Sequence, residues 1–322
     1  MPARRGILDR VVLLHLAVLA ALFAAQFVIG DYQHLSVARI MVLATYAVGY
    51  NILFGYTGLL SLGHAMFFSA GLYGAGLTAS LLAFGAPEAF LAGIVAGLVL
   101  SAVMGLIILR TSGVSFMIVT MMFAQAGYLI ILYFGEFTRG DEGIVLTGDI
   151  RTAHLFGFAL DLTSATVRYN VALVLLAVCV LLCLALVRSP IGRILVAIRE
   201  NEERARMLGY DTFRNKLLAL VISGTISAAA GAAYGLLFAY VGATFASIQY
   251  SILPLLWVLL GGVGTVLGPI VGTLLMFYLV DFTSGYTSAY MLVVGVALVA
   301  LVIWFPKGLL GTLREKVLPW LP

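Results

Sequence analysis

Long runs of apolar residues dominate this chain, and short polar segments separate them. Runs of about 20 residues are long enough to cross a bilayer as helices, and the ten-residue alternation typical of barrel strands is absent. The pattern therefore predicts an all-α polytopic membrane protein. The candidate spans are 11–30, 38–56, 60–84, 89–109, 114–134, 169–187, 217–240 and 288–305, with a longer apolar region at 251–282.

The charged residues between these spans divide by sign, which predicts the orientation of the chain. If the helices alternate from an inside N-terminus, most of the 18 Lys and Arg residues fall in segments on one side. Cytoplasmic loops collect Lys and Arg, so this side is predicted to be the cytoplasm. The first apolar run follows Arg4, Arg5 and Arg10, and it is long enough to be an uncleaved span rather than a secretory signal.

The apolar region at 251–282 must cross the membrane twice, or enter it and return, if the basic C-terminal segment is also cytoplasmic. The glycine-rich stretch 261–265 is the predicted turn. Freed backbone groups at such a turn have to be covered by protein or line a wet cavity. The expected architecture is therefore about ten transmembrane or re-entrant helices, with both termini cytoplasmic.

A second glycine-interrupted stretch lies in the first half of the chain, at 55–76. Broken membrane segments in each half indicate a transport pathway in repeat-built transporters, although small residues also serve close helix packing. Both interpretations stay open here. The candidate pathway residues are Asn51, Thr57, Gly58, Ser61, His64, Gly261, Gly262, Gly264 and Thr265.

One dense block of charge, at 189–216, interrupts the apolar sequence on the predicted cytoplasmic side. Within it, a helix over 199–208 would form three i,i+4 pairs of opposite charge, and Gly209 stands where a C-cap glycine belongs. We expect a rigid polar helix on which a soluble partner could act; a solvated linker is the alternative. On the opposite side, the loop 135–168 is the largest extracytoplasmic segment.

Composition excludes several classes of protein. With 63% hydrophobic and 10% charged residues, the chain is no soluble domain, and its net charge of +4 is too small and localised to indicate nucleic acid. Cys179 and Cys183 lie one helical turn apart in an apolar run, so we expect core or lipid-facing residues and no metal site. The chain has no phosphate-binding P-loop, no zinc-protease motif and no nucleophile elbow. We therefore expect no enzyme activity, and energy for transport must come from elsewhere.

Several stretches together resemble one family. They are GYNILFGYTGLLSLGHAMFFSAGLYGAG, TRGDEG, AIRENEERARMLGYDTFRNKLLALVISG, WVLLGGVGTVLGPIVG and FPKGLLG. This set is similar to the permease subunits of branched-chain amino-acid ATP-binding-cassette (ABC) importers, and more closely to the M-type (LivM-like) member of the permease pair. The resemblance runs over roughly residues 39–311.

The resemblance implies a multi-pass permease of the bacterial inner membrane, a single transmembrane domain over 1–322 that moves branched-chain or related hydrophobic amino acids inward by alternating access. The implied partners are a homologous H-type permease, two cytoplasmic ATPase subunits that bind ATP and Mg, a periplasmic substrate-binding protein and the lipid bilayer. No cofactor is expected on this chain. The implied coupling residues are Arg199, Glu200, Asn201, Glu202, Glu203, Ala205 and Gly209.

Two alternatives remain. Permeases for urea, small amides or other amino acids share most of these motifs. The second alternative, from a different class of protein, is a passive channel. It would be built on the two glycine-broken segments and would need no soluble partner.

Overall fold

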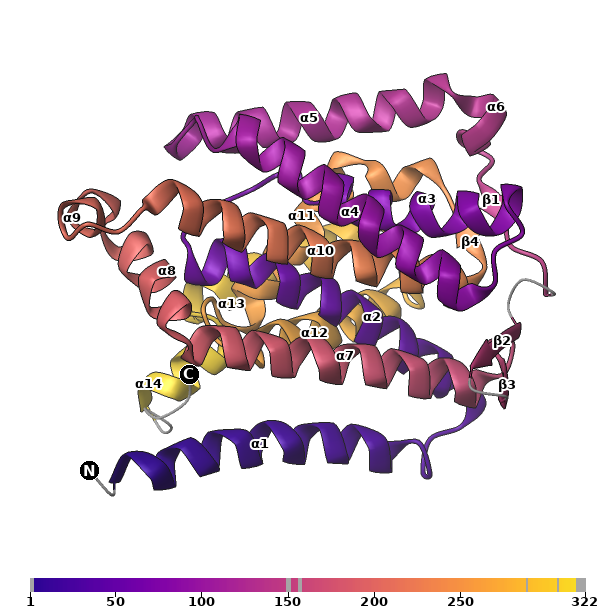
Figure 1. Ribbon diagram of the computed structural model, residues 1–322. Coiled ribbons are helices and arrows are strands. Elements are labelled where there is room, and N and C mark those ends of the chain that lie inside the picture. The colour runs from indigo at the N-terminus through magenta and orange to yellow at the C-terminus, as the bar shows by residue number, and fades with distance from the viewer. Residues whose placement is uncertain (1–2, 149–151, 156–157, 288, 306, 317–322) are drawn as a thin grey trace.

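Helices make up most of the structure, and their long axes run roughly alongside one another (Figure 1). The computed structural model describes residues 3–148, 152–155, 158–287, 289–305 and 307–316. The helices are α1 (Ala3–Ala25), α2 (Asp31–Asn51) with the π-helical turn η1 (Ile52–Tyr56), α3 (Ala65–Leu81), α4 (Ala86–Ile108), α5 (Gly113–Tyr133), α6 (Gly135–Thr138), α7 (Ala165–Arg188), α8 (Pro190–Glu200), α9 (Glu202–Met207), α10 (Thr212–Phe238), the 3-10 turn η3 (Ala243–Ala246), α11 (Ile248–Gly261), α12 (Gly268–Ser284), α13 (Tyr290–Trp304) and α14 (Leu309–Lys316).

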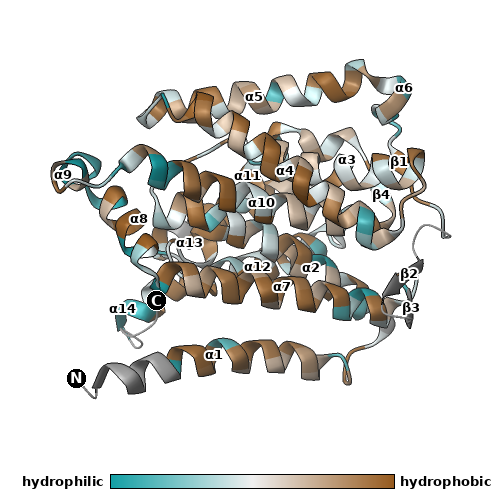
Figure 2. Ribbon diagram, in the orientation of Figure 1, coloured by the Kyte–Doolittle hydropathy of each residue, from teal (hydrophilic) through white to brown (hydrophobic). Residues whose placement is uncertain are grey.

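Five helices in the described ranges are long and apolar enough to cross a membrane: α2 with η1, α4, α5, α7 and α10. Five shorter apolar helices accompany them, in α1, α3, α11, α12 and α13. This arrangement confirms the predicted all-α polytopic class in its coarse form. Figure 2 shows hydrophobic residues along the outer helices α4, α5 and α7, and hydrophilic ones at α9 and α14.

The core of the bundle is built on α2 and α10, which are mostly buried. Small residues let other helices approach α10 closely. Gly231 packs against the carbonyl of Phe68 on α3, and Gly71 on α3 packs against Ala228. Such small-residue contacts are the usual way in which membrane helices gain packing energy where no hydrophobic effect drives them together.

The predicted division of the apolar region 251–282 by a turn is confirmed: two helices, α11 and α12, are joined by the turn 262–267. The 14 residues of α11 span only about 21 Å, less than the hydrocarbon thickness of roughly 30 Å. Its N-terminal end continues instead into η3 and the short strand β4 (Tyr240–Val241).

Several predicted boundaries are wrong, and two of them concern the segments around the glycine turn 57–64 and the loop 135–168. The span expected at 60–84 begins only at Ala65, because residues 57–64 form a turn instead of helix. The loop expected at 135–168 ends before α7 starts at Ala165, and it contains α6 and strands. Strand β1 (Ile144–Val145) pairs antiparallel with β4, with Ile144 opposite Val241, and β2 (Thr152–Leu155) pairs with β3 (Phe158–Asp161). The helical architecture therefore carries two small sheets that the apolar pattern did not reveal.

The strands and the charged helices lie at opposite ends of the bundle (Figure 1). The beginning of α1, the helices α8 and α9, and α14 gather at one end, which we call the basic end. The strands β1 to β4 and α6 lie at the other. Cys179 and Cys183 are both buried within α7, so of the two expected settings the core is the observed one.

Candidate functional site

The charged block consists of two helices that meet at Asn201. Ser189 caps α8, with its hydroxyl accepting from the Gly192 N–H at 3.2 Å. Asn201 has extended backbone angles, ends α8 and caps α9, and its side-chain oxygen accepts from the Arg204 N–H at 2.8 Å. Because an N-cap residue has a non-helical backbone, one continuous helix cannot pass through it.

This break corrects the prediction of one helix over 199–208. Of the three expected i,i+4 pairs, only Glu202–Arg206 forms, at 3.3 Å. Arg199 instead pairs with its neighbour Glu200 at 2.8 Å, and the described part of the chain has no ion pair between Arg199 and Glu203 or between Glu200 and Arg204.

Glu202 also makes a contact that pair spacing could not reveal. Its carboxylate lies 2.6 Å from Nζ of Lys216, which is almost fully buried in the first turns of α10. Partial burial opposes the ionisation of Glu202, but the hydrogen bond and charge of Lys216 outweigh it, so the pKa of the Glu202 carboxyl lies below its usual value. The pair ties α9 to the start of a core helix.

The tip of the charged block presents apolar side chains to solvent. Met207 is 77% exposed and Leu208 is 72% exposed, next to the exposed Glu203, whereas Ala205 is buried beneath them. The chain leaves α9 through Gly209 at φ +88, with bonds from Gly209 N to Arg206 O and from Tyr210 N to Ala205 O. This is a Schellman cap, and it confirms the cap predicted at Gly209.

Arg199 connects the charged block to both glycine-interrupted segments. Its Nη1 donates to the carbonyl of Gly55 at 2.6 Å, at the end of η1. Its stem lies against Gly58, where a methyl group would come within 2.8 Å of Cγ. The same guanidinium lies beside Gly264, where an added methyl group would be 3.0 Å from Nη1. A single side chain from α8 therefore contacts both turns.

Asn51 ties the second glycine turn, 262–267, to the core helix α2. Fully buried at the end of α2, it donates from Nδ2 to the Thr265 carbonyl at 2.9 Å and accepts at Oδ1 from the Gly264 N–H at 3.1 Å. The backbone of this turn is thus satisfied by protein, as a membrane interior requires. Gly264 has φ +70, a conformation that favours glycine.

The turn 57–64 is held by hydroxyl groups from neighbouring helices. The Tyr50 hydroxyl donates to the Ser61 carbonyl at 3.0 Å, and the Leu62 N–H donates to the Thr120 hydroxyl at 3.1 Å. His64 Nε2 lies 2.7 Å from the Ser223 hydroxyl, which itself donates to a backbone carbonyl of α2. The Ser223 oxygen is therefore an acceptor for His64, which places the proton of the ring on Nε2.

The predicted pathway residues are brought together, but most are buried in packing contacts. The Thr57 hydroxyl donates to the Ile52 carbonyl, and the Ser61 hydroxyl accepts from Gly63 N. Gly261 packs directly on the backbone of α12 at Gly268, which supports the packing interpretation at that position. Gly58 is exposed, and Gly262 has φ +133 in the turn.

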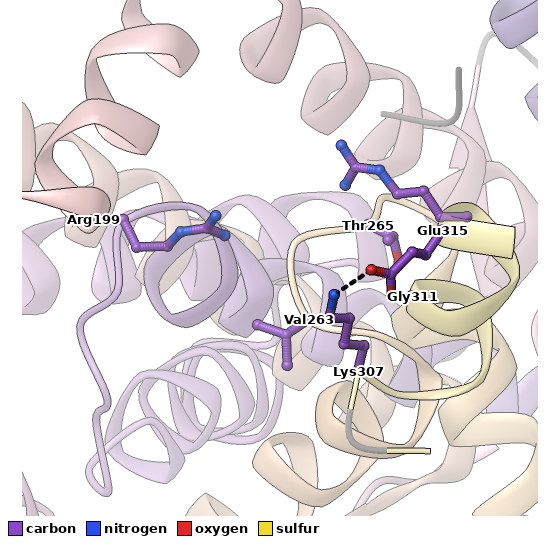
Figure 3. A pocket seen from close by; sticks show the side chains of 7 residues that line it. Arg199, Val263, Thr265, Lys307, Gly311 and Glu315 are labelled. Carbon is purple, nitrogen blue, oxygen red and sulfur yellow. Dashed lines mark hydrogen bonds and ion pairs between the residues drawn. The ribbon is translucent and has the colours of Figure 1, made fainter. Parts of the chain in front are cut away.

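Thr265 is the predicted pathway residue that lines the main cavity at the basic end (Figure 3). This cavity has a volume of about 580 Å³ and lies where α8, the turn 262–267 and α14 meet. Arg199 reaches into it from one side, and the ion pair between Lys307 and Glu315, at 2.7 Å, lies on another. Its lining residues are Arg199, Val263, Thr265, Lys307, Gly311, Arg314 and Glu315.

Metal chemistry finds no support in the described residues, which contain no cluster of three or more His, Cys, Asp or Glu side chains. The geometry consists of an exposed helical tip, an arginine that links it to two turns, and an amide that holds the second turn to the core helix α2. Such an arrangement can transmit movement but carries no catalytic group.

Comparisons with known proteins point to one family of transport permeases. A family model described as a branched-chain amino acid transport system permease component matches residues 35–303. The high-affinity branched-chain amino acid permease protein LivM of Escherichia coli K12 is 29% identical over 299 residues, covering 86% of this chain and 69% of LivM. LivM of Salmonella typhimurium is 27% identical, over 98% of this chain and 79% of its own length. LivH of Escherichia coli K12 is 26% identical, over 83% of this chain and 91% of LivH.

No solved structure gives a significant match. The family match begins within α2 and ends within α13, so it covers both glycine turns and the whole charged block. The chain belongs to the family of branched-chain amino acid transport permeases.

Proposed function

We propose that this chain is one permease subunit of an ABC importer in a bacterial inner membrane, carrying branched-chain or related hydrophobic amino acids into the cytoplasm by alternating access. Family membership and the resemblance to LivM and LivH support this substrate class and pairing with a homologous H-type permease. A periplasmic binding protein delivers the substrate. Two cytoplasmic ATPase subunits, which hold ATP and Mg, supply the energy.

The ATPase docks on the tip of α9 in this proposal. Exposed Met207 and Leu208, flanked by charged residues, form an apolar contact with a charged rim, as protein interfaces commonly do. Glu200, Asn201 and Glu203 are exposed around it. The basic end therefore faces the cytoplasm, which agrees with the positive-inside rule.

Arg199 is the single observation that carries the coupling mechanism. Movement of α8 and α9 reaches the membrane interior through the bond from Arg199 to the Gly55 carbonyl and through its contact with Gly264. Asn51 holds the turn 262–267 to the end of α2, about which the turn moves. In this mechanism the turn 261–265 is the moving part of the pathway. Its fixed side is formed by Thr57, Gly58, Ser61 and His64.

The proposal is tested by uptake into proteoliposomes that contain the assembled transporter and its binding protein. We expect ATP-dependent uptake of labelled leucine that isoleucine and valine inhibit and urea does not. Arg199→Gln removes a charge-assisted hydrogen bond of about 1.5–3 kcal/mol, so we expect uptake to fall about tenfold or more while ATP hydrolysis persists.

Arg193→Gln is the matched control, because Arg193 is an exposed arginine on the same helix. We expect this variant to transport normally. Uptake that continues without ATP would indicate the passive channel, and inhibition by urea would indicate the small-amide permease. Normal uptake by Arg199→Gln would remove Arg199 from the coupling mechanism.

A further inference from the structure

Two arginines from separate charged segments converge on the turn 262–267 at the basic end. Arg199 on α8 places Nη1 3.0 Å from where a Cβ at Gly264 would lie. Arg314 on α14 places its own Nη1 3.5 Å from the Gly264 carbonyl oxygen. Both line the cavity of about 580 Å³. Two positive groups so close to one residue repel each other unless an anion lies between them.

The protein supplies little negative charge inside this cavity. Glu315, the one carboxylate of its lining, is engaged by Lys307 at 2.7 Å. Glu200 accepts from Nε and Nη2 of Arg199, but it is not among the lining residues. In the described part of the chain, Arg314 forms no ion pair with any carboxylate. Guanidinium donors are therefore left for an anion from outside the chain.

An apolar cavity adjoins the other face of α14. Leu310 and Leu313 of that helix line a space of about 210 Å³ together with Leu14 and Val18 of α1. Helix α14 thus separates a cationic cavity from an apolar one, as an amphipathic helix at a membrane interface does. A ligand that suits both spaces has an anionic head and a hydrocarbon chain.

We propose that the cavity at the basic end binds the phosphate group of an anionic phospholipid between Arg199 and Arg314, with an acyl chain against the apolar face of α14. Basic pockets between membrane helices suit such head groups, and guanidinium binds phosphate oxygens with paired hydrogen bonds. The bound lipid bridges α8 to α14 across the turn. This assignment depends on the charge and shape of the site, and it holds whichever substrate the permease carries.

The test measures thermal unfolding of the full chain, purified in mild detergent with any subunits that remain bound. We expect dioleoylphosphatidylglycerol to raise the melting temperature by about 2 °C and dioleoylphosphatidylcholine to leave it unchanged, because a ligand that binds only the folded state stabilises that state. Arg314→Gln should abolish most of that rise. Lys316→Gln is the matched control, since Lys316 is an exposed cation on the same helix that does not line the cavity.

Native mass spectrometry gives a second measurement that does not depend on stability. We expect phosphatidylglycerol to be retained by the unaltered chain and by Lys316→Gln, and to be lost from Arg314→Gln. Equal retention by both variants would overturn the site. If inorganic phosphate alone gives the same rise in melting temperature, the ligand is a free oxyanion and the lipid assignment is wrong.

Discussion

The two glycine turns of this permease are held in place by different means. The turn 57–64 is fixed by helices of the membrane interior, through the hydroxyls of Tyr50, Thr120 and Ser223. The turn 262–267 has one such anchor, Asn51. It also contacts Arg199 and Arg314, which come from the charged helices at the basic end, and Gly262 packs against the backbone at Gly308 and Gly311. Arg199 touches the first turn as well, through its stem at Gly58.

This difference distinguishes a turn that is held rigidly from a turn that can move with the charged helices. Hydroxyl groups that bond to the backbone inside a bundle have no water to replace their partners, so breaking them is costly. Arginines at the membrane boundary can exchange a carbonyl for water or for a carboxylate at lower cost. The turn 262–267 is therefore the better candidate for movement, and the turn 57–64 for its fixed counterpart.

The largest expected effect comes from removing Asn51, the anchor of the turn 262–267 in the core. Asn51→Ala leaves the Gly264 N–H and the Thr265 carbonyl buried without this partner, so we expect a loss of about 2–4 kcal/mol in the free energy of unfolding. Denaturant unfolding in detergent measures it. Asn215→Ala, at a half-buried asparagine whose side chain donates to the Asp211 carbonyl near the start of α10, should cost less than about 1 kcal/mol. Equal losses would show that Asn51 is no anchor.

A methyl group added to each turn sharpens the comparison. In Gly63→Ala, the new methyl group collides with the backbone carbonyl of Thr120, which cannot yield, so we expect a loss of about 2–3 kcal/mol in unfolding free energy. In Gly264→Ala, it meets the flexible end of Arg199, and the positive φ adds about 1 kcal/mol. The same unfolding measurement ranks them. A larger loss for Gly264→Ala would reverse the assignment of fixed and mobile turns.

The smallest expected effect concerns the attachment of α9 and depends on pH. The lowered pKa of Glu202 means that its pair with Lys216 stabilises the folded state above the ordinary glutamate pKa, and that this contribution is lost as pH falls through the lowered value. Glu202→Gln should therefore cost about 1 kcal/mol at neutral pH and progressively less in acid. Melting temperatures across the acid range measure this. Glu203→Gln, at an exposed position, should show no such trend.

The local sequence was sufficient to predict a structural feature wherever that feature depends on a single helix or turn. Apolar run length predicted the spanning helices, and the glycines at 261–265 predicted the turn between α11 and α12. The helix cap at Gly209 was also predictable from the place of this glycine in the sequence, because the hydrogen bonds of the cap join residues only three to five positions apart. The family resemblance, carried by motifs along most of the chain, gave the permease identity that the family match shows.

Contacts between distant segments were decided only by the tertiary structure. The i,i+4 rule predicted pairs for Arg199 and Glu202, yet their shortest side-chain hydrogen bonds, both 2.6 Å, are with Gly55 and Lys216, which lie 144 and 14 residues away. Asn51 lies 214 residues from Thr265. The sequence by itself determined which segments form apolar helices long enough to cross a membrane, since the hydrophobic length of a segment is a local property. Which side chain holds a distant turn depends on helix packing, because a hydrogen bond forms only where its donor and acceptor are brought within about 3 Å of each other.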